Sequence, residues 1–229
     1  MNHLLVDIEQ VKKWIEKIYS DFLFDIVGIA TSKGEILPLN LEPGTLGNII
    51  EGLLIAFINQ KIGDRKDTSI TEGGNRFYPD LEITGPLLNN KLLALDIKAA
   101  RRNEKNRNRT QSRMTLYSFG TYLKHQGKKF PQIIRPFNEY AYHLDLIAIF
   151  DVDNKNKKVS NFELLVVEPW KIASTRASSA TRDYVGAIME IDKMRANTGG
   201  EFSTQQEFYD HWAKISRRGE KAERPIPDE

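Results

Sequence analysis

The chain has 229 residues, of which 40% are hydrophobic and 28% charged, and its formal net charge is only +2. This composition is that of an ordinary soluble globular protein, long enough for one large α/β domain or two small ones. The absence of cysteine excludes disulfides, thiolate zinc sites and cysteine nucleophiles. No apolar run reaches the length of a membrane span, so the sequence predicts a cytoplasmic protein with no membrane partner.

The first part of the chain predicts a helix followed by a β-hairpin. Residues 7–22 place apolar side chains on one helical face, namely Ile8, Val11, Ile15, Ile18 and Phe22. That face packs on the protein's own core or forms a dimer contact, and the sequence does not separate the two. Residues 25–31 and 35–39 alternate as strands around a turn at 32–34.

A second, strongly apolar helix is predicted at residues 44–62, with Glu51 as its only acidic residue. An acid in so apolar a helix usually faces solvent, and the alternative is a carboxylate that reaches an active site. The polar, glycine-rich residues 61–75 then predict a loop that leads into Tyr78-Pro79-Asp80.

Residues 78–98 are the centre of the sequence and predict two adjacent strands joined by a turn. Asp96 and Lys98 lie in the second strand, where alternation places their side chains on the same face. The first strand runs back beside the second and brings Asp80 onto that face. Two carboxylates and an ammonium group therefore converge in a space the size of a phosphate.

This constellation suits metal-assisted cleavage of a phosphodiester. Hard oxygen ligands such as Asp80 and Asp96 hold Mg²⁺, and a neighbouring lysine orients the attacking water or helps to deprotonate it. The alternative is a simple surface ion pair, because strand-end Asp and Lys residues often form one.

A basic run follows, with six Lys or Arg residues and one acid between Lys98 and Arg109. Such a run is most often a solvated surface loop. Because it leaves the end of the candidate catalytic strand, Arg101 and Arg102 are also candidates for contacts with a DNA backbone.

The second half of the chain predicts a strand or short helix at 112–125, strands at 144–152 and 162–168 joined by a polar turn, and a helix at 203–215. Ser203 and Gln206 form a candidate capping box for that helix. We interpret the sequence His143-x-Asp145 as structural, because nothing near it supplies a nucleophile. Residues 1–216 are predicted to form one domain, followed by a charged, flexible tail at 217–229.

Residues 174–184 are small, polar and rich in groups that can bond base edges. Arg182 can bond guanine at two points, and Asp183 can accept from cytosine. Alone, the segment is equally typical of a surface loop.

At this point the chain resembles the EcoRV-type type II restriction endonucleases, a branch of the PD-(D/E)xK nuclease superfamily. The separation of 16 positions between Asp80 and Asp96 is like that of the family. The resemblance extends over most of the chain and includes residues 27–39, 78–80, 93–98, 135–140 and 208–212. It implies an α/β (α+β) fold, with a mixed five-stranded sheet core flanked by helices and with β-hairpin and loop elements that contact DNA.

The resemblance also implies roles for particular residues. Asp80 and Asp96 match the metal-binding acids, Lys98 the essential lysine, and Glu51 an auxiliary catalytic and metal-binding carboxylate. The loop at 73–76, with Gly74, Asn75 and Arg76, matches one that approaches the minor groove. The major-groove recognition loop falls at Ser178, Ser179, Ala180, Thr181, Arg182 and Asp183.

The sequence departs from the family in two places. Residues 180–183 replace a pattern rich in Gly, Asn and Thr, and Ala99 and Ala100 replace polar residues after the lysine. The target sequence is therefore expected to differ, and the Arg-Asp pair points towards G·C base pairs.

The resemblance predicts a homodimer that cuts double-stranded DNA at a short palindromic site. Mg²⁺ is the expected cofactor, with Mn²⁺ able to substitute, and the products carry 5′-phosphates on blunt ends by family analogy. A cognate DNA methyltransferase is expected in the same host. The alternatives are a structure-specific or repair nuclease of the same superfamily, and a sequence-specific DNA-binding protein that does not cleave.

Overall fold

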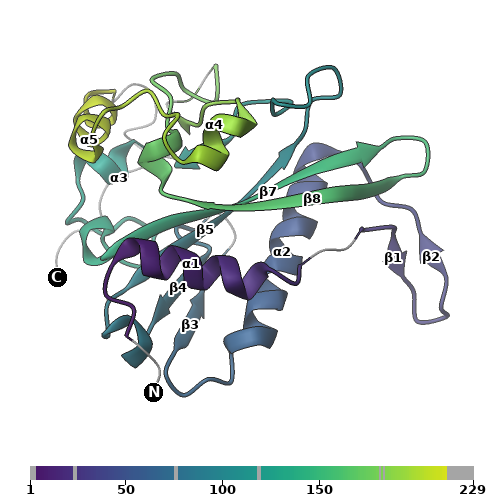
Figure 1. Ribbon diagram of the computed structural model, residues 1–229, viewed down its shortest axis with the longest axis horizontal. Coiled ribbons are helices and arrows are strands. Elements are labelled where there is room, and N and C mark those ends of the chain that lie inside the picture. Colours follow the sequence, from purple (N-terminus) through teal and green to yellow (C-terminus); the bar gives the residue numbers. More distant parts are fainter. Residues whose placement is uncertain are drawn as a thin grey trace.

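The computed structural model describes residues 4–22, 25–74, 77–117, 120–180, 182 and 184–215. Its centre is a five-stranded sheet with the order β3-β4-β5-β7-β8 (Figure 1). Strands β5 and β7 run parallel, and the other neighbours are antiparallel, so the predicted mixed five-stranded sheet is confirmed. The bounds are β3 Ser69–Glu72, β4 Leu81–Thr84, β5 Leu93–Arg101, β7 Tyr142–Asp153 and β8 Lys158–Val167.

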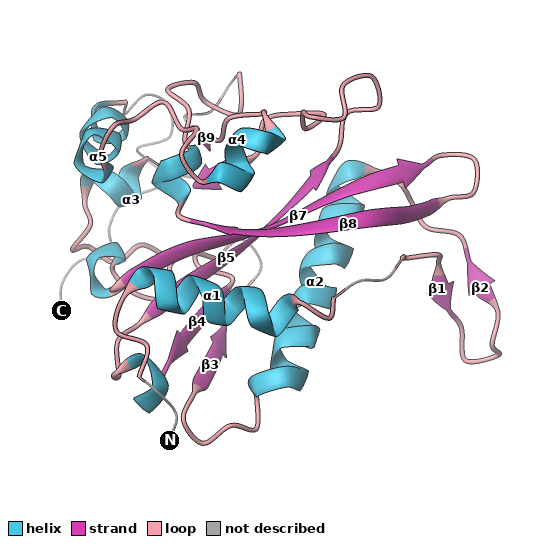
Figure 2. Ribbon diagram, viewed as in Figure 1, coloured by secondary structure: helices cyan, strands magenta, loops and turns pink. Residues whose placement is uncertain are grey.

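Helices cover both faces of this sheet (Figure 2). Helices α1 (Ile8–Tyr19) and α2 (Pro43–Ile62) pack on the face formed by Leu93, Leu95 and their neighbours. The opposite face carries the C-terminal layer, which contains β6 (Thr115–Tyr117), β9 (Val185–Gly186), α3 (Thr121–Lys124), α4 (Ile191–Ala196) and α5 (Gln205–Lys214). Short 3₁₀ turns at Pro86–Leu88, Phe137–Glu139 and Pro169–Ile172 complete the elements.

The apolar face of α1 packs on the protein's own core. Val11, Ile15 and Ile18 are buried, and the Tyr19 hydroxyl donates to the carbonyl of Leu54 on α2 at 2.9 Å. Asp7 begins the helix, because its side chain accepts from the N–H of Gln10. The sequence left open whether this face packs on the protein's own core or forms a dimer contact, and the structure shows the first.

The predicted hairpin is formed by β1 (Ile29–Ala30) and β2 (Ile36–Leu37), which stand away from the body of the molecule (Figure 1). Gly28 lies so close to the second strand that a Cβ atom there would be 2.4 Å from the carbonyl oxygen of Leu37. A glycine is therefore required at this crossing.

Three features differ from the sequence prediction. Residues 69–72 form the edge strand β3 instead of a loop, and their polarity reflects the exposed edge of the sheet. Helix α4 was not predicted, because six residues show little periodicity. The capping box of α5 lies one residue later than predicted: Thr204 accepts from the N–H of Glu207, whose carboxylate accepts from the N–H of Ser203.

The predicted tail at 217–229 lies outside the described residues. None of the helices in the described part of the chain combines the length and the apolar character needed to cross a bilayer.

Candidate active site

Strands β4 and β5 position the two acids and the lysine. Leu81 pairs with Leu95, which places Asp80 directly across from Asp96. The N–H of Asp80 donates to Asp96 Oδ1 at 3.2 Å, and the N–H of Ile97 donates to Asp80 Oδ2 at 2.6 Å. The Lys98 ammonium forms an ion pair with Asp96 Oδ2. The structure thus brings together the three side chains that the sequence placed on one face.

These groups line a cavity of about 660 Å³, together with Glu51 from α2 and Tyr117 from β6. A second hollow of about 500 Å³ also borders on Glu51 and Lys98 and extends between the start of α2 and residues 112–115. Glu51 therefore points towards the site, and the alternative of a solvent-facing acid does not describe it. The two hollows share Glu51 and Lys98 in their linings.

Burial and mutual repulsion shape the electrostatics of the site. Burial, together with the charge of Asp96, raises the pKa of Asp80 to about 9. Burial and Asp96 also raise the pKa of Glu51, although Lys98 opposes them. Burial alone would lower the pKa of Lys98, but its carboxylate neighbours outweigh it, so this pKa lies above its usual range. Lys98 is therefore an ammonium group, a donor of hydrogen bonds and positive charge.

The donor set fits a divalent cation. Among the described residues no three acidic or histidine side chains are gathered closely enough to form a ready-made cation site. Mg²⁺, however, is usually held by only one or two carboxylates together with water and substrate phosphates. Asp80 and Asp96 would supply these hard oxygen ligands. Burial and, after it, the charge of Asp96 raise the pKa of Asp80, and a cation between the two carboxylates would offset that repulsion.

The pKa of Asp80 predicts how the stability of the metal-free protein depends on pH. The folded state keeps a proton that the unfolded state has lost between about pH 4 and pH 9, so the free energy of unfolding falls as pH rises. Below about pH 6.5 His143 acts in the opposite direction, because burial lowers its pKa to about 3. Between pH 6.5 and 8.5 we expect a loss of at most about 1.4 kcal/mol per pH unit from Asp80.

Urea unfolding in EDTA at pH 6.5, 7.5 and 8.5 measures this slope. Asp80→Asn should make it shallower without abolishing it, because burial also raises the pKa values of Asp145 and Glu51. Asp153→Asn is the control, since hydrogen bonds from Asn156 hold the pKa of Asp153 below its usual range. An equal slope in wild type and Asp80→Asn would contradict the assignment.

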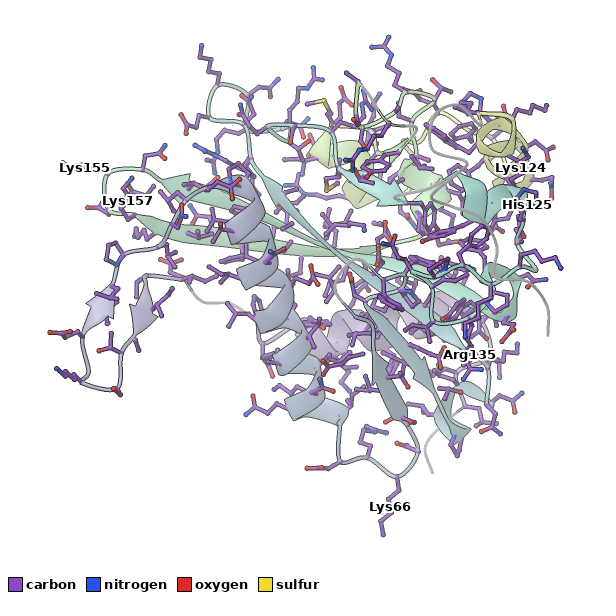
Figure 3. The ribbon with its side chains drawn as sticks, turned by 180° about the vertical axis from the view of Figure 1, so that it is seen from behind. Lys66, Lys124, His125, Arg135, Lys155 and Lys157 are labelled. Atoms are coloured by element: carbon purple, nitrogen blue, oxygen red, sulfur yellow. The ribbon has the colours of Figure 1, made fainter. Side chains whose placement is uncertain are left out.

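The basic run is largely engaged within the protein. Arg102 is 8% exposed and donates to Glu163 at 2.8 Å, which leaves it little freedom to contact a ligand. Arg101 pairs with Glu104, and Arg107 forms a two-point ion pair with Asp151 at 2.9 and 2.8 Å. Arg101 remains partly exposed at the end of β5. Other cations lie at the periphery, where Figure 3 shows Lys66, Lys155 and Lys157 on outlying turns.

The predicted recognition loop is attached next to the cavity. Strand β9 pairs with β6, and the hydroxyls of Ser178 and Thr115 lie 2.6 Å apart. Thr115 borders on the second hollow, so the loop begins beside that hollow. Within the loop, the Arg182 guanidinium lies over the Tyr184 ring at 5.4 Å. Ser179 and Ala180 are also described, whereas Thr181 and Asp183 lie outside the described residues.

The predicted minor-groove loop folds back on the catalytic strand. The N–H of Gly73 donates to the carbonyl of Asp80 at 2.7 Å, and a Cβ atom on Gly73 would lie 2.4 Å from the carbonyl oxygen of Pro79. This close approach requires glycine. Gly74 accepts from the N–H of Phe77, which lines the cavity. Asn75 and Arg76 are not among the described residues.

Sequence reasoning missed Asp145, which lies in β7 in register with Asp96 and is 1% exposed. The signal was present in His143-x-Asp145 but was interpreted as structural. For His143 that interpretation agrees with its surroundings, since its ring stacks on Phe137 and its Nδ1 lies 2.6 Å from the Tyr78 hydroxyl. Asp145 differs, because neither of its carboxyl oxygens has a hydrogen-bond partner among the described residues.

Comparison with known proteins agrees with this geometry. A family model described as "Restriction endonuclease EcoRV" matches residues 12–227. The type II restriction enzyme EcoRV of Escherichia coli is 25% identical over 211 residues, which cover 85% of this chain and 83% of that enzyme. Among solved structures, the NlaIV restriction endonuclease has a TM-score of 0.52 and 16% sequence identity, covering 93% of this chain and 80% of its own.

The fold is the one that this chain shares with a solved restriction endonuclease. Because the family model spans nearly the whole chain, the protein belongs to the EcoRV restriction endonuclease family. It is a type II site-specific deoxyribonuclease. The predicted family, fold class and class of enzyme are confirmed.

Proposed function

We propose that this enzyme cuts both strands of DNA at a short palindromic site, in a reaction that depends on Mg²⁺ and in which Mn²⁺ can substitute. The products would carry 5′-phosphates on blunt ends, and the enzyme would act in the cytoplasm beside a cognate DNA methyltransferase. The observation that carries the proposal is the convergence of Asp80, Asp96 and Lys98 on one cavity.

Each residue of the site has a distinct proposed role. A divalent cation held by Asp80 and Asp96, with Glu51 near it, would neutralise phosphate charge and make a bound water more acidic. Lys98 keeps its proton and donates hydrogen bonds to the reacting phosphate or to the attacking water. The backbone N–H groups of Asp80 and Ile97 hold the two carboxylates in place.

The proposed DNA contacts surround this cavity. Gly74 and its loop would approach one groove, while Ser178, Ser179, Ala180 and Arg182 would reach base edges in the other. Arg101 is exposed enough at the end of β5 to contact a phosphate. We leave Arg102 out of this set, because burial and its pairing with Glu163 occupy its guanidinium.

The proposed active form is a twofold homodimer. A twofold pair of identical sites faces the two antiparallel strands of a palindrome equivalently. The exposed hairpin supports this form, because Val27, Ile29, Ile36 and Leu37 are 53, 53, 62 and 51% exposed, respectively. Large apolar side chains gathered in this way are typical of a protein interface.

Digestion of a long DNA of known sequence tests the proposal. Purified enzyme with Mg²⁺ should give sharp bands, and Asp96→Ala should give none. Sequencing the ends would reveal the target and the type of end. A smear would instead favour a structure-reading nuclease, and a gel shift without cutting would favour a DNA-binding protein that does not cleave.

A further inference from the structure

Asp145 is a buried carboxylate whose oxygens both lack a hydrogen-bond donor among the described residues. Such an arrangement is rare, since buried polar groups are nearly always paired. The hydroxyl groups of Tyr78 and Tyr117, whose surroundings include Asp145, have other partners: Tyr78 is bonded to His143, and Tyr78 and Tyr117 interact with each other. The carboxyl group of Asp145 is therefore buried without the hydrogen bonds that usually stabilise such a group.

Its position explains which partner it can take. Asp145 and Asp96 are neighbours in the parallel register of β5 and β7, so their side chains leave the sheet on the same face. Lys98 lies two residues further along β5 on that face, diagonally from Asp145 in the strand register, and the two groups interact electrostatically. The ammonium of lysine carries three donors on a flexible stem, and among the described residues Lys98 pairs directly with Asp96 alone.

Asp96 cannot keep this pairing unchanged if it binds a cation. Its Oδ1 already accepts from the N–H of Asp80 and its Oδ2 from Lys98. An ammonium on the same oxygen competes with a cation and repels it. If Lys98 turned away without another acceptor, a buried charge would be left unpaired, which is costly.

We infer that Asp145 is a positioning residue for Lys98. It is an alternative acceptor that binds the Lys98 ammonium when Asp96 binds a cation instead. This inference rests on the proposed function, because it assumes that Asp96 is a metal ligand and that Lys98 serves the reaction. In this inference Asp145 acts through Lys98 and not on the substrate or the cation. It frees an oxygen of Asp96 and keeps the ammonium beside the site.

The test compares Asp145→Asn with wild type in three measurements on the full-length enzyme. In EDTA the thermal midpoint should stay within about 2 °C, because asparagine has nearly the shape of the acid. The Mg²⁺ concentration that gives half of the metal-induced thermal shift should rise about tenfold or more, since Lys98 stays on Asp96. The single-turnover cleavage rate should fall by a similar factor. Asp153→Asn makes the same change at the far end of β7 and should alter none of these.

A double-mutant cycle separates positioning from a general structural role. In a Lys98→Met background, Asp145→Asn should leave the Mg²⁺ midpoint unchanged, because the residue that it positions is gone. An equal shift in both backgrounds, or a protein that no longer folds in EDTA, would show that Asp145 is structural and overturn the inference. Wild-type behaviour of Asp145→Asn would also overturn it. If Asp96→Ala and Lys98→Met cleave normally, the proposed function itself fails, which is a different result.

Discussion

Replacement of Lys98 by methionine is expected to lower the single-turnover rate of DNA cleavage between about a hundredfold and a thousandfold. The ammonium is held among carboxylates whose combined charge keeps its pKa above the usual range, so it enters the reaction as a fixed positive donor. Methionine keeps much of the length of the side chain but removes both the charge and the donors. The measurement uses a labelled duplex containing the target and enzyme in excess over DNA.

Two comparisons give this result its meaning. Lys66→Met removes a lysine from the exposed turn between α2 and β3, which lies at the periphery of the molecule in Figure 3, and should cleave at the wild-type rate. DNA binding by Lys98→Met in a gel shift should remain within about threefold of wild type, since the lost donor acts mainly on the reacting phosphate. Cleavage by Lys98→Met at near the wild-type rate would remove the lysine from the scheme.

The arrangement of the catalytic residues on the central pair of strands could be predicted, because it depends on residues that are close together in the sequence. Alternation along β5 places Asp96 and Lys98 on one face, and the short connection from β4 fixes where Asp80 can lie. If the pairing of the strands slipped by one residue, the charged side chains would move to the other face of the sheet and enter the apolar core. The cost of burying them there enforces the register. Glu51 could not be decided in this way, because its orientation depends on how α2 crosses the end of β5.

The remaining differences come from contacts between distant segments. Asp145 meets Asp96 only because β7 returns parallel to β5, and nothing near either residue in the sequence reports that pairing. The pairing of Arg102 with Glu163 could not be predicted, because Glu163 is 61 positions away and comes from the neighbouring hairpin. Strand β3 looked like a loop because an edge strand has only one partner and tolerates polar residues on its exposed side.

The β1–β2 hairpin raises the question of what covers its apolar side chains. Ile29 and Leu37 lie directly opposite each other on one face, and Ile36 pairs with Ala30 on the other. A two-stranded hairpin is only marginally stable alone in water, so these residues gain more from an interface than from exposure. Helix α1 cannot supply that interface with its apolar face, which is already buried in the protein's own core.

The double variant Ile29→Lys with Leu37→Glu is therefore expected to dissociate the proposed homodimer. The new residues form a cross-strand ion pair that preserves the hairpin and the net charge, while desolvating the pair would disfavour association. Sedimentation at micromolar concentration should show a monomer, and double-strand cleavage should fall at least about a hundredfold, because one protomer presents only one site to the duplex.

Leu4→Lys with Val6→Glu is the matched control. Leu4 and Val6 are 52 and 50% exposed, and the N–H of the intervening Leu5 donates to the carbonyl of Leu87, near the end of the sheet away from the hairpin. This variant should remain a dimer and cut normally. If the hairpin variant also sediments as a dimer, the interface lies elsewhere. If it is a monomer and still cuts both strands at the wild-type rate, the twofold requirement itself is wrong, because a single site would then serve both strands in turn.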